Sequence, residues 1–160
     1  MKKKEEIPLR LGVGIILLND NNEVFVGKRI DNPEDFWQMP QGGVDKNENF
    51  LDAAKRELEE ETSIKNIKLI KEIEGWLTYE LPNDLLGKIW KGKYRGQKQK
   101  WFIMKFLGNN DEINIKTKKP EFLNWKWVKS SKLPEVAVNF KINIYKKISK
   151  ELSTLKKIKL

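Results

Sequence analysis

The sequence contains neither cysteine nor histidine among its 160 residues. Without cysteine there are no disulfides, no thiolate nucleophile and no zinc site made of thiolates. Without histidine, a general base that acts near neutral pH must be a carboxylate, a lysine or a metal-bound hydroxide. The candidate groups for chemistry are therefore carboxylates, lysines and any metal that they bind.

Long apolar runs are absent as well. A membrane-spanning helix needs roughly 18 or more apolar residues, whereas the early apolar segment LGVGIILL is short and ends in NDNN. A secretory signal would need a longer apolar core and a small-residue cleavage site. We therefore expect a cytoplasmic protein that has no membrane partner.

Acidic residues are the minority charge, with 23 against 32 lysines and arginines, which gives a net charge of +9. Basic residues gather at both ends of the chain and in the segment GKIWKGKYRGQKQK, from Gly87 to Lys100. At the ends a solvated, lysine-rich surface accounts for them. In the middle segment Trp90 and Tyr94 alternate with lysines, a mixture that binds phosphates and offers rings to bases, so surface charge and a binding role both stay open.

The order of the expected elements indicates one α+β domain over residues 1–160, in which helices cover a sheet. Residues 1–8 and 153–160 are expected to be loosely ordered basic ends. LGVGIILLN and EVFVGKRI, joined by NDNN, predict a strand hairpin, and DNPEDFWQMPQGG is typical of a loop. Further strands are expected in IKLIKEIEGWLTYEL, with a turn at Gly75, and in KWFIMKFLG and EFLNWKWVK.

Two helices are predicted. The first runs from about Phe50 to Thr62 and has Asn49 as its N-cap. The second runs from about Val136 to Leu152. Apolar residues four positions apart mark its buried side: Phe140, Ile144, Ile148 and Leu152.

The first helix ends in an acidic cluster where its dipole disfavours negative charge. Spacings of three and four place Glu57, Glu60 and Glu61 on one face, and Glu59 falls outside that face. Each like-charged neighbour would cost a few tenths of a kcal/mol. A divalent cation such as Mg²⁺ or Mn²⁺ would reverse that sign, since converging oxygen ligands suit a hard ion. A solvated helix face is the alternative for such a run.

The spacing around this cluster resembles the Nudix box. The matching positions are Gly42, Gly43, Glu48, Arg56, Glu57, Leu58, Glu60, Glu61 and Ile64. The one departure is Ser63, where the family pattern has a glycine that closes the helix in a left-handed conformation. Serine there should cost on the order of 1 kcal/mol without touching the ligands.

The resemblance extends from roughly Leu11 to Lys147. It rests on VGIILLN, VFVGKRIDNPEDFWQMPQGG, WLTYELP, YRGQKQKWF, INIKT, PEFLNWKW and VNFK. These segments resemble the branch of the Nudix family that contains bacterial RNA pyrophosphohydrolases and the dinucleoside polyphosphate hydrolases of bacteria and plants. The resemblance implies an α/β/α sandwich with a mixed sheet and a loop–helix catalytic motif.

The same resemblance implies hydrolysis of a phosphoanhydride. The substrate would be a dinucleoside polyphosphate, the 5′-triphosphate end of RNA, or both, and no DNA substrate is expected. Basic charge does not discriminate between them because both are polyanions. A nucleotide-binding or RNA-binding module without turnover is the alternative, and the oligomeric state stays open.

The resemblance also implies roles for individual residues. The metal ligands would be Glu57, Glu60, Glu61 and Glu121, with Gly42 allowing close backbone approach, and more than one Mg²⁺ or Mn²⁺ would bind. Either Glu60, Glu121 or a metal hydroxide would take the proton. Arg56 would orient the glutamates, and Glu48 would tie the loop to the helix.

Seven further residues are implied as substrate contacts: Arg29, Gln97, Gln99, Lys100, Val138, Phe140 and Lys141. Alternatives stay open for several of them. Arg29 could be an ordinary strand-edge cation, strand pairing could account for the two glutamines, and Phe140 could belong to the core. For Trp37, Trp76, Trp125 and Trp127, packing is favoured over base stacking.

Overall fold

The computed structural model describes residues 3–157 of the chain. Of the ends that we expected to be loosely ordered, residues 1–2 and 158–160 lie outside the described part. Within it, Lys4–Glu6 form a short 3₁₀ helix (η1), and the last helix continues to Lys157. No helix in the described range is long and apolar enough to cross a membrane.

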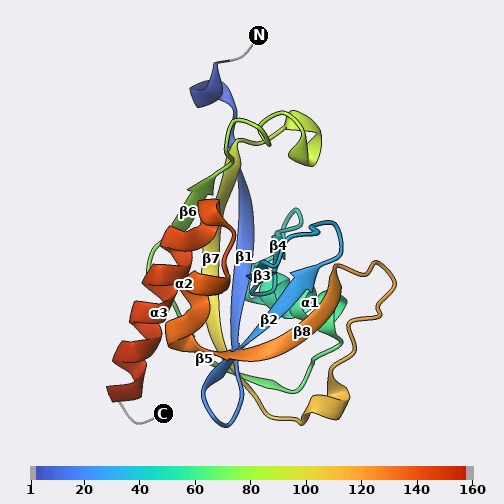
Figure 1. The fold of residues 1–160 in the computed structure, drawn as a ribbon, viewed down its shortest axis with the longest axis vertical. Helices are drawn as coiled ribbons and strands as arrows, with labels where there is room; N and C mark the ends of the chain where they lie inside the picture. The colour runs from blue at the N-terminus through green and yellow to red at the C-terminus, as the bar shows by residue number, and fades with distance from the viewer. Residues whose placement is uncertain (1–2, 158–160) are drawn as a thin grey trace.

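Eight strands form one mixed sheet at the centre of the molecule (Figure 1). They are β1 (Leu9–Leu18), β2 (Glu23–Arg29), β3 (Trp37–Gln38), β4 (Gln41–Gly43), β5 (Ile67–Glu72), β6 (Leu77–Glu80), β7 (Gly96–Phe106) and β8 (Phe122–Lys129). Their order is β3-β2-β1-β7-β5, with β4 paired to β1, β6 to β7 and β8 to β2. The pairing of β1 with β7 is parallel and the pairing of β1 with β2 is antiparallel, so the expected mixed sheet is confirmed.

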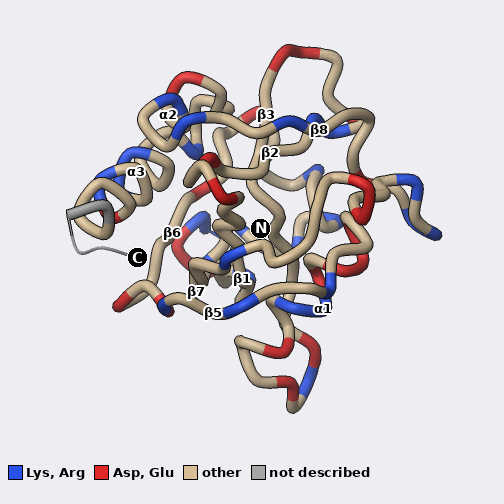
Figure 2. The backbone as a smooth tube through the Cα atoms, turned by 90° about the horizontal axis from the view of Figure 1, so that it is seen from below, with Lys and Arg blue, Asp and Glu red and all other residues tan. Residues whose placement is uncertain are grey.

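Helices cover both faces of this sheet. They are α1 (Phe50–Thr62), α2 (Leu133–Val136) and α3 (Ile142–Lys157), with 3₁₀ turns η2 (Ile89–Gly92), η3 (Asn110–Glu112), η4 (Ser130–Lys132) and η5 (Asn139–Lys141). Figure 2 places α1 on one side of the sheet and α2 and α3 on the other. Several lysines lie along α3, so their positive charge is on the side of the sheet away from the acidic helix α1 (Figure 2). The expected α/β/α sandwich is confirmed.

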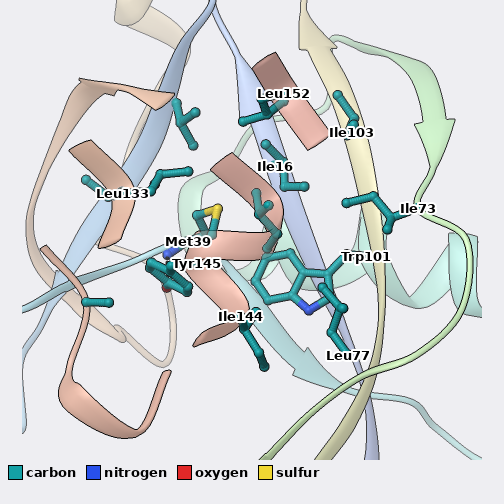
Figure 3. Close-up of a cluster of buried hydrophobic side chains, with 14 of the residues drawn as sticks. Ile16, Met39, Ile73, Leu77, Trp101, Ile103, Leu133, Ile144, Tyr145 and Leu152 are labelled. Carbon is teal, nitrogen blue, oxygen red and sulfur yellow. Dashed lines mark hydrogen bonds between the residues drawn. The ribbon is translucent and has the colours of Figure 1, made fainter. Parts of the chain in front are cut away.

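Alternation along β1 divides the apolar side chains between two cores. Val13 and Ile15 face α1, where they join Leu58, whereas Ile16 faces the core that contains Ile148 of α3. Figure 3 shows the second core, in which the Met39 N–H donates a 2.8 Å hydrogen bond to the buried Tyr145 hydroxyl. Each fully buried aliphatic side chain contributes roughly 1.5–3 kcal/mol, so both layers are held firmly on the sheet.

The strands β1 and β2 separate soon after the turn that joins them. Their one register pair is Leu18 with Val24, and farther along β1 pairs with β4 while β2 pairs with β3. The expectation that DNPEDFWQMPQGG is a loop is therefore wrong in part, because β3 and β4 lie within it. Each is only two or three residues long, which is too short to show an alternating pattern, and β4 is stabilised by a strand distant in the sequence.

The predicted C-terminal helix begins later than expected. Val138 is extended, with φ −62° and ψ 147°, and it separates α2 from η5 and α3. Phe140, expected on the apolar side of the helix, lies before it and packs on Tyr79 with ring centroids 5.6 Å apart. The regular spacing of apolar residues thus came from two segments that share one core, and not from one helix.

Candidate active site

Helix α1 holds the acidic cluster, and both of its ends are capped. The Asn49 side chain accepts a 2.8 Å hydrogen bond from the Asp52 N–H, which confirms the predicted N-cap. Ser63 has φ 67° and closes the helix in the left-handed conformation that we predicted for this position. Its hydroxyl donates a 2.8 Å hydrogen bond to the Asn114 carbonyl, which a glycine could not do. This hydrogen bond offsets part of the cost of the left-handed backbone.

Arg56 connects the loop before α1 to the carboxylates on it. Its guanidinium donates to Glu48 at 2.8 Å, to the Gly43 carbonyl at 2.9 Å and to Glu57 at 2.9 Å. It also donates to Glu60 at 3.2 Å. The hydrogen bond from Arg56 lowers the pKa of Glu48 to about 2. These contacts are the arrangement expected of a residue that orients the glutamates.

Two of the carboxylates are buried enough to be unstable as isolated charges. Burial raises the pKa of Glu57 to about 6, even though Arg56 favours its charged form. Burial, followed by the charges of Glu57 and Glu121, raises the pKa of Glu61 well above its usual range. Glu61 is only 4% exposed, and its Oε2 has no hydrogen-bond partner within residues 3–157. A buried carboxylate oxygen without a partner is stabilised by binding a proton or a cation.

These residues fit a divalent metal ion. The set consists of carboxylate oxygens, which hard divalent ions prefer, and Glu61 supplies an unused one. A side chain at Gly42 would collide with the Glu57 carboxylate, so only glycine permits this close approach. Within residues 3–157 no three acidic side chains already converge as a metal cage, and Arg56 engages both Glu57 and Glu60. A carboxylate has about four lone-pair sites, so Glu57 and Glu60 can stay hydrogen-bonded to Arg56 and still bind an ion.

The carboxylates open into a cavity of about 1440 Å³. Ten of the predicted residues line it: Arg29, Gly42, Glu57, Glu60, Glu61, Gln97, Glu121, Val138, Phe140 and Lys141. Glu59, which we expected outside the metal face, is exposed and also lies in the lining. The cavity exceeds the roughly 300–1,000 Å³ of ordinary small-molecule pockets, so it can hold a nucleotide together with a polyphosphate.

Basic side chains face the carboxylates across this cavity. Arg29 donates to Asp31 at 2.7 Å and lies 3.8 Å from Glu121, and its pKa is raised chiefly by the hydrogen bond to Asp31. Lys141 is 6% exposed, and its ammonium lies 3.2 Å from the Gln38 side-chain oxygen. Burial, followed by the charge of Arg29, lowers the pKa of Lys141 to about 7.

Two predicted substrate contacts are not in the described lining of the cavity. Gln99 donates to the Gln41 side chain at 3.2 Å and accepts from the Trp101 indole at 3.2 Å, so it holds two strands together. Lys100 points to the other face of β7 and contacts the Gly75 carbonyl at 3.3 Å. Lys100 lies outside the described lining of the cavity because alternation along β7 turns it away from Gln97 and Gln99, and its role as a substrate contact stays a prediction.

Other cavity residues were not among the predicted site residues, although Trp90 lies in the basic segment whose binding role we left open and Trp37 was expected to pack. Arg10 is the one charged residue of the apolar strand β1, and its guanidinium lies 5.4 Å from the centre of the Trp90 ring. Both residues line the cavity, together with Tyr79 and Trp37. An arginine inside an apolar strand was the available signal for Arg10. The packing expected of Trp125 and Trp127 does hold, since both rings lie 5.7 Å from Phe25.

Comparison with known proteins decides the family, because residues 8–148 match the NUDIX domain. The chain belongs to the NUDIX family. It is 60% identical over 152 residues to a protein of Pelagibacter ubique (strain HTCC1062) named RNA pyrophosphohydrolase, covering 95% of this chain and 96% of that relative. A protein of the same name from Roseobacter denitrificans is 50% identical over 141 residues, covering 87% and 88% of the two chains.

Solved Nudix structures share the fold at low sequence identity. The E. coli dihydroneopterin triphosphate pyrophosphohydrolase superposes with a TM-score of 0.72 at 21% identity, covering 93% of this chain and 99% of that one. A C. elegans Ap4A hydrolase superposes with a TM-score of 0.62 at 20% identity, covering 89% and 98%. The family, the fold class and the assignment as a Nudix hydrolase, all expected from the sequence, are confirmed.

Proposed function

We propose that this Nudix hydrolase removes pyrophosphate from the 5′-triphosphate end of RNA. One observation carries the proposal: buried, metal-fitting carboxylates on α1 and the cationic side chains Arg29 and Lys141 line the same cavity. The names of the relatives, at up to 60% identity, favour RNA. The likeness to an Ap4A hydrolase is at 20% identity and supports the fold alone, so dinucleoside polyphosphates are the second substrate class to test.

The metal would be held by Glu57, Glu60, Glu61 and Glu121, and we expect more than one Mg²⁺ or Mn²⁺. When bound, it would neutralise phosphate oxygens and lower the pKa of a water molecule. Arg56 acts as a positioning residue, because it holds Glu57 and Glu60 against the Gly43 loop. In a chain without histidine, Glu60 or Glu121 is the side chain available to accept the proton of the attacking water.

In the reaction, water adds across the α–β phosphoanhydride, the bridging bond breaks, and pyrophosphate leaves. The problem is one of charge, since a triphosphate repels an approaching oxygen nucleophile. Arg29, Lys141 and Arg10, which line the same cavity, would contact phosphate oxygens. The rings of Phe140 and Tyr79, 5.6 Å apart, would contact a base.

The test is hydrolysis of triphosphorylated RNA and of diadenosine tetraphosphate, measured side by side with Mg²⁺ and with Mn²⁺. We expect the higher kcat/KM on RNA, with pyrophosphate as product, and loss of turnover in Glu57→Gln. Hydrolysis of the tetraphosphate alone would assign the second substrate class. Metal-independent RNA binding without any product would instead support a binding module. Fractionation of cells would test the predicted cytoplasmic location.

A further inference from the structure

An exposed tryptophan with two lysines lies outside the cavity. Trp76 is 37% exposed, just before β6, and the ammonium groups of Lys98 and Lys100 lie 4.7 Å and 4.8 Å from the centre of one of its rings. Phe50 supports the indole edge-on, with ring centroids 5.3 Å apart. We call Trp76, Lys98 and Lys100 the Trp76 patch.

The Trp76 patch lies on the face of β7 opposite to the cavity. Gln97 and Gln99 are fully buried, and Gln97 lines the cavity. Lys98 and Lys100 alternate with them and so project from the other face, the one that α1 covers farther along the strand. Neither lysine is among the described residues that line the cavity. The hydrolytic site thus leaves these two cations unused.

A groove leads from the carboxylates toward the patch. It has a volume of about 370 Å³ and shares Arg10 and Glu57 with the main cavity. Leu11, which is 51% exposed, lies in this groove and is the register partner of Lys98 across the parallel pair β1–β7. Partners in adjacent strands point to the same face, so Leu11 places the edge of the groove next to Lys98 of the patch.

The chemistry of the patch suits a single-stranded polynucleotide. Two ammonium groups against one indole repel each other, and a phosphate between them would relieve that repulsion. The Glu72 carboxylate, 3.8 Å from Lys100, is exposed and neutralises it only weakly. An indole beside lysines is the combination that binds bases and phosphates of single strands.

We propose that the Trp76 patch binds the RNA chain downstream of the 5′ end while that end occupies the cavity. The inference rests on the proposed function and narrows its substrate to RNA that carries several nucleotides. It also gives Lys100 a role as a phosphate contact, away from the reacting phosphates. A dinucleoside polyphosphate has no polynucleotide chain to follow this groove.

The first test compares kcat/KM on a triphosphorylated dinucleotide and on a triphosphorylated, unstructured RNA of about ten nucleotides. The wild type should prefer the longer RNA. Trp76→Ala should reduce this preference by about fivefold or more, since one base stack on an aromatic ring is worth that much, and Lys98→Gln by a smaller factor. Activity on the dinucleotide should stay unchanged in both variants.

The matched control is the double change Lys146→Gln and Lys147→Gln, which removes two exposed lysines from α3 on the other side of the sheet. It should leave the length preference at the wild-type value. If the Trp76→Ala variant does not fold, the Lys98→Gln variant still tests the proposal. An equal length preference in all variants would overturn the proposal.

A second test does not depend on hydrolysis. Fluorescence anisotropy would measure binding of a ten-nucleotide RNA with a 5′-hydroxyl, over a range of salt concentrations. Lys98→Gln should reduce the slope of log K against log salt by about 0.7, the value for one phosphate contact on a single strand. If the wild type fails to hydrolyse RNA, the proposed function is wrong, but this slope still tests whether the Trp76 patch binds single-stranded RNA. An unchanged slope and an unchanged affinity in both Trp76→Ala and Lys98→Gln would refute RNA binding by the Trp76 patch.

Discussion

The acidic and the basic sides of the cavity are built in different ways. On the acidic side, Arg56 already compensates Glu57 and Glu60 through direct hydrogen bonds, and Glu61 stays buried with an unpartnered oxygen. On the basic side, Lys141 is buried with one neutral partner, the Gln38 amide oxygen. Burial raises the pKa of Glu57 and Glu61 and lowers the pKa of Lys141. On the acidic side Glu61 keeps an oxygen without a partner, and on the basic side Lys141 has no hydrogen-bonded partner of opposite charge among the described residues.

This difference indicates what each side requires from a ligand. A cation would stabilise the carboxylates, and an anion would stabilise Lys141 as an ammonium. The proposed metal-bound polyphosphate would offer both charges at once and would relieve the electrostatic cost of burying Glu61 and Lys141. The following changes test the two sides, from the largest expected effect to the smallest.

Glu57→Gln should have the largest effect. It removes a carboxylate from the metal side, and we expect kcat to fall by at least about 10³-fold, because the metal supplies several kcal/mol to the reaction. In the wild type, Mg²⁺ or Mn²⁺ should also raise the Tm, and the variant should lose most of that gain. Steady-state kinetics and thermal melts with and without metal would measure the two effects.

Glu59→Gln is the matched control on the same helix. Although Glu59 is exposed in the lining of the cavity, its position on α1 lies off the face shared by the other glutamates. It should retain kcat within tenfold and keep the metal-dependent gain in Tm. If the Glu57 and Glu59 variants lose equal amounts of kcat and of the metal-dependent gain in Tm, the acidic cluster acts only as surface charge and not as a metal site.

Arg56→Lys should weaken the site without removing a ligand. A lysine is a point charge and cannot reach Glu48, Glu57 and the Gly43 carbonyl together. We expect metal affinity or kcat to fall by about 10- to 100-fold, as for other residues that position metal ligands. Titration of Tm with Mg²⁺ would measure the affinity, and unchanged titration curves would show that Arg56 does not orient the carboxylates.

Lys141 should make the stability of the metal-free protein depend on pH. Its pKa falls from an ordinary 10.5 to about 7 on folding, so between these values the unfolded chain binds more protons than the folded one. The free energy of unfolding should therefore rise with pH from about 7 to 10, by up to about 1.4 kcal/mol per pH unit. Arg29, Asp31 and Glu61 also face this amine.

The comparison that isolates this slope is Lys141→Met, which keeps the apolar stem and removes the titrating group. Urea unfolding at several pH values should show a smaller increase above pH 7 in the variant than in the wild type. Identical slopes in the two proteins would mean that Lys141 keeps its ordinary pKa in the fold.

Substitution of Ser63 should have the smallest effect. Ser63→Gly relieves the left-handed backbone but loses the hydrogen bond to the Asn114 carbonyl, so stability should change by less than about 1 kcal/mol. Ser63→Ala keeps the strain and loses the hydrogen bond, and it should be destabilised by about 1 kcal/mol. Urea unfolding would rank the three proteins, and a large stabilisation by glycine would show that the hydroxyl contributes little.

Local signals in the sequence determined helix α1 and its motif. Its bounds, the cap at Asn49 and the shared face of Glu57, Glu60 and Glu61 follow from residues close along the chain, and the left-handed conformation at Ser63 was implied by the glycine of the family pattern. The resemblance to the Nudix box depends on spacing within this one loop and helix, which a linear pattern can record.

Tertiary structure decided the rest of the site, because burial and pairing depend on residues that are distant in the chain. The pairing of β4 with β1, the burial of Lys141 beside Gln38 and the place of Arg10 beside Trp90 have no local pattern. Strand alternation in β7 predicts opposite faces for Gln97 and Lys98. Only the packed sheet shows which face the cavity occupies.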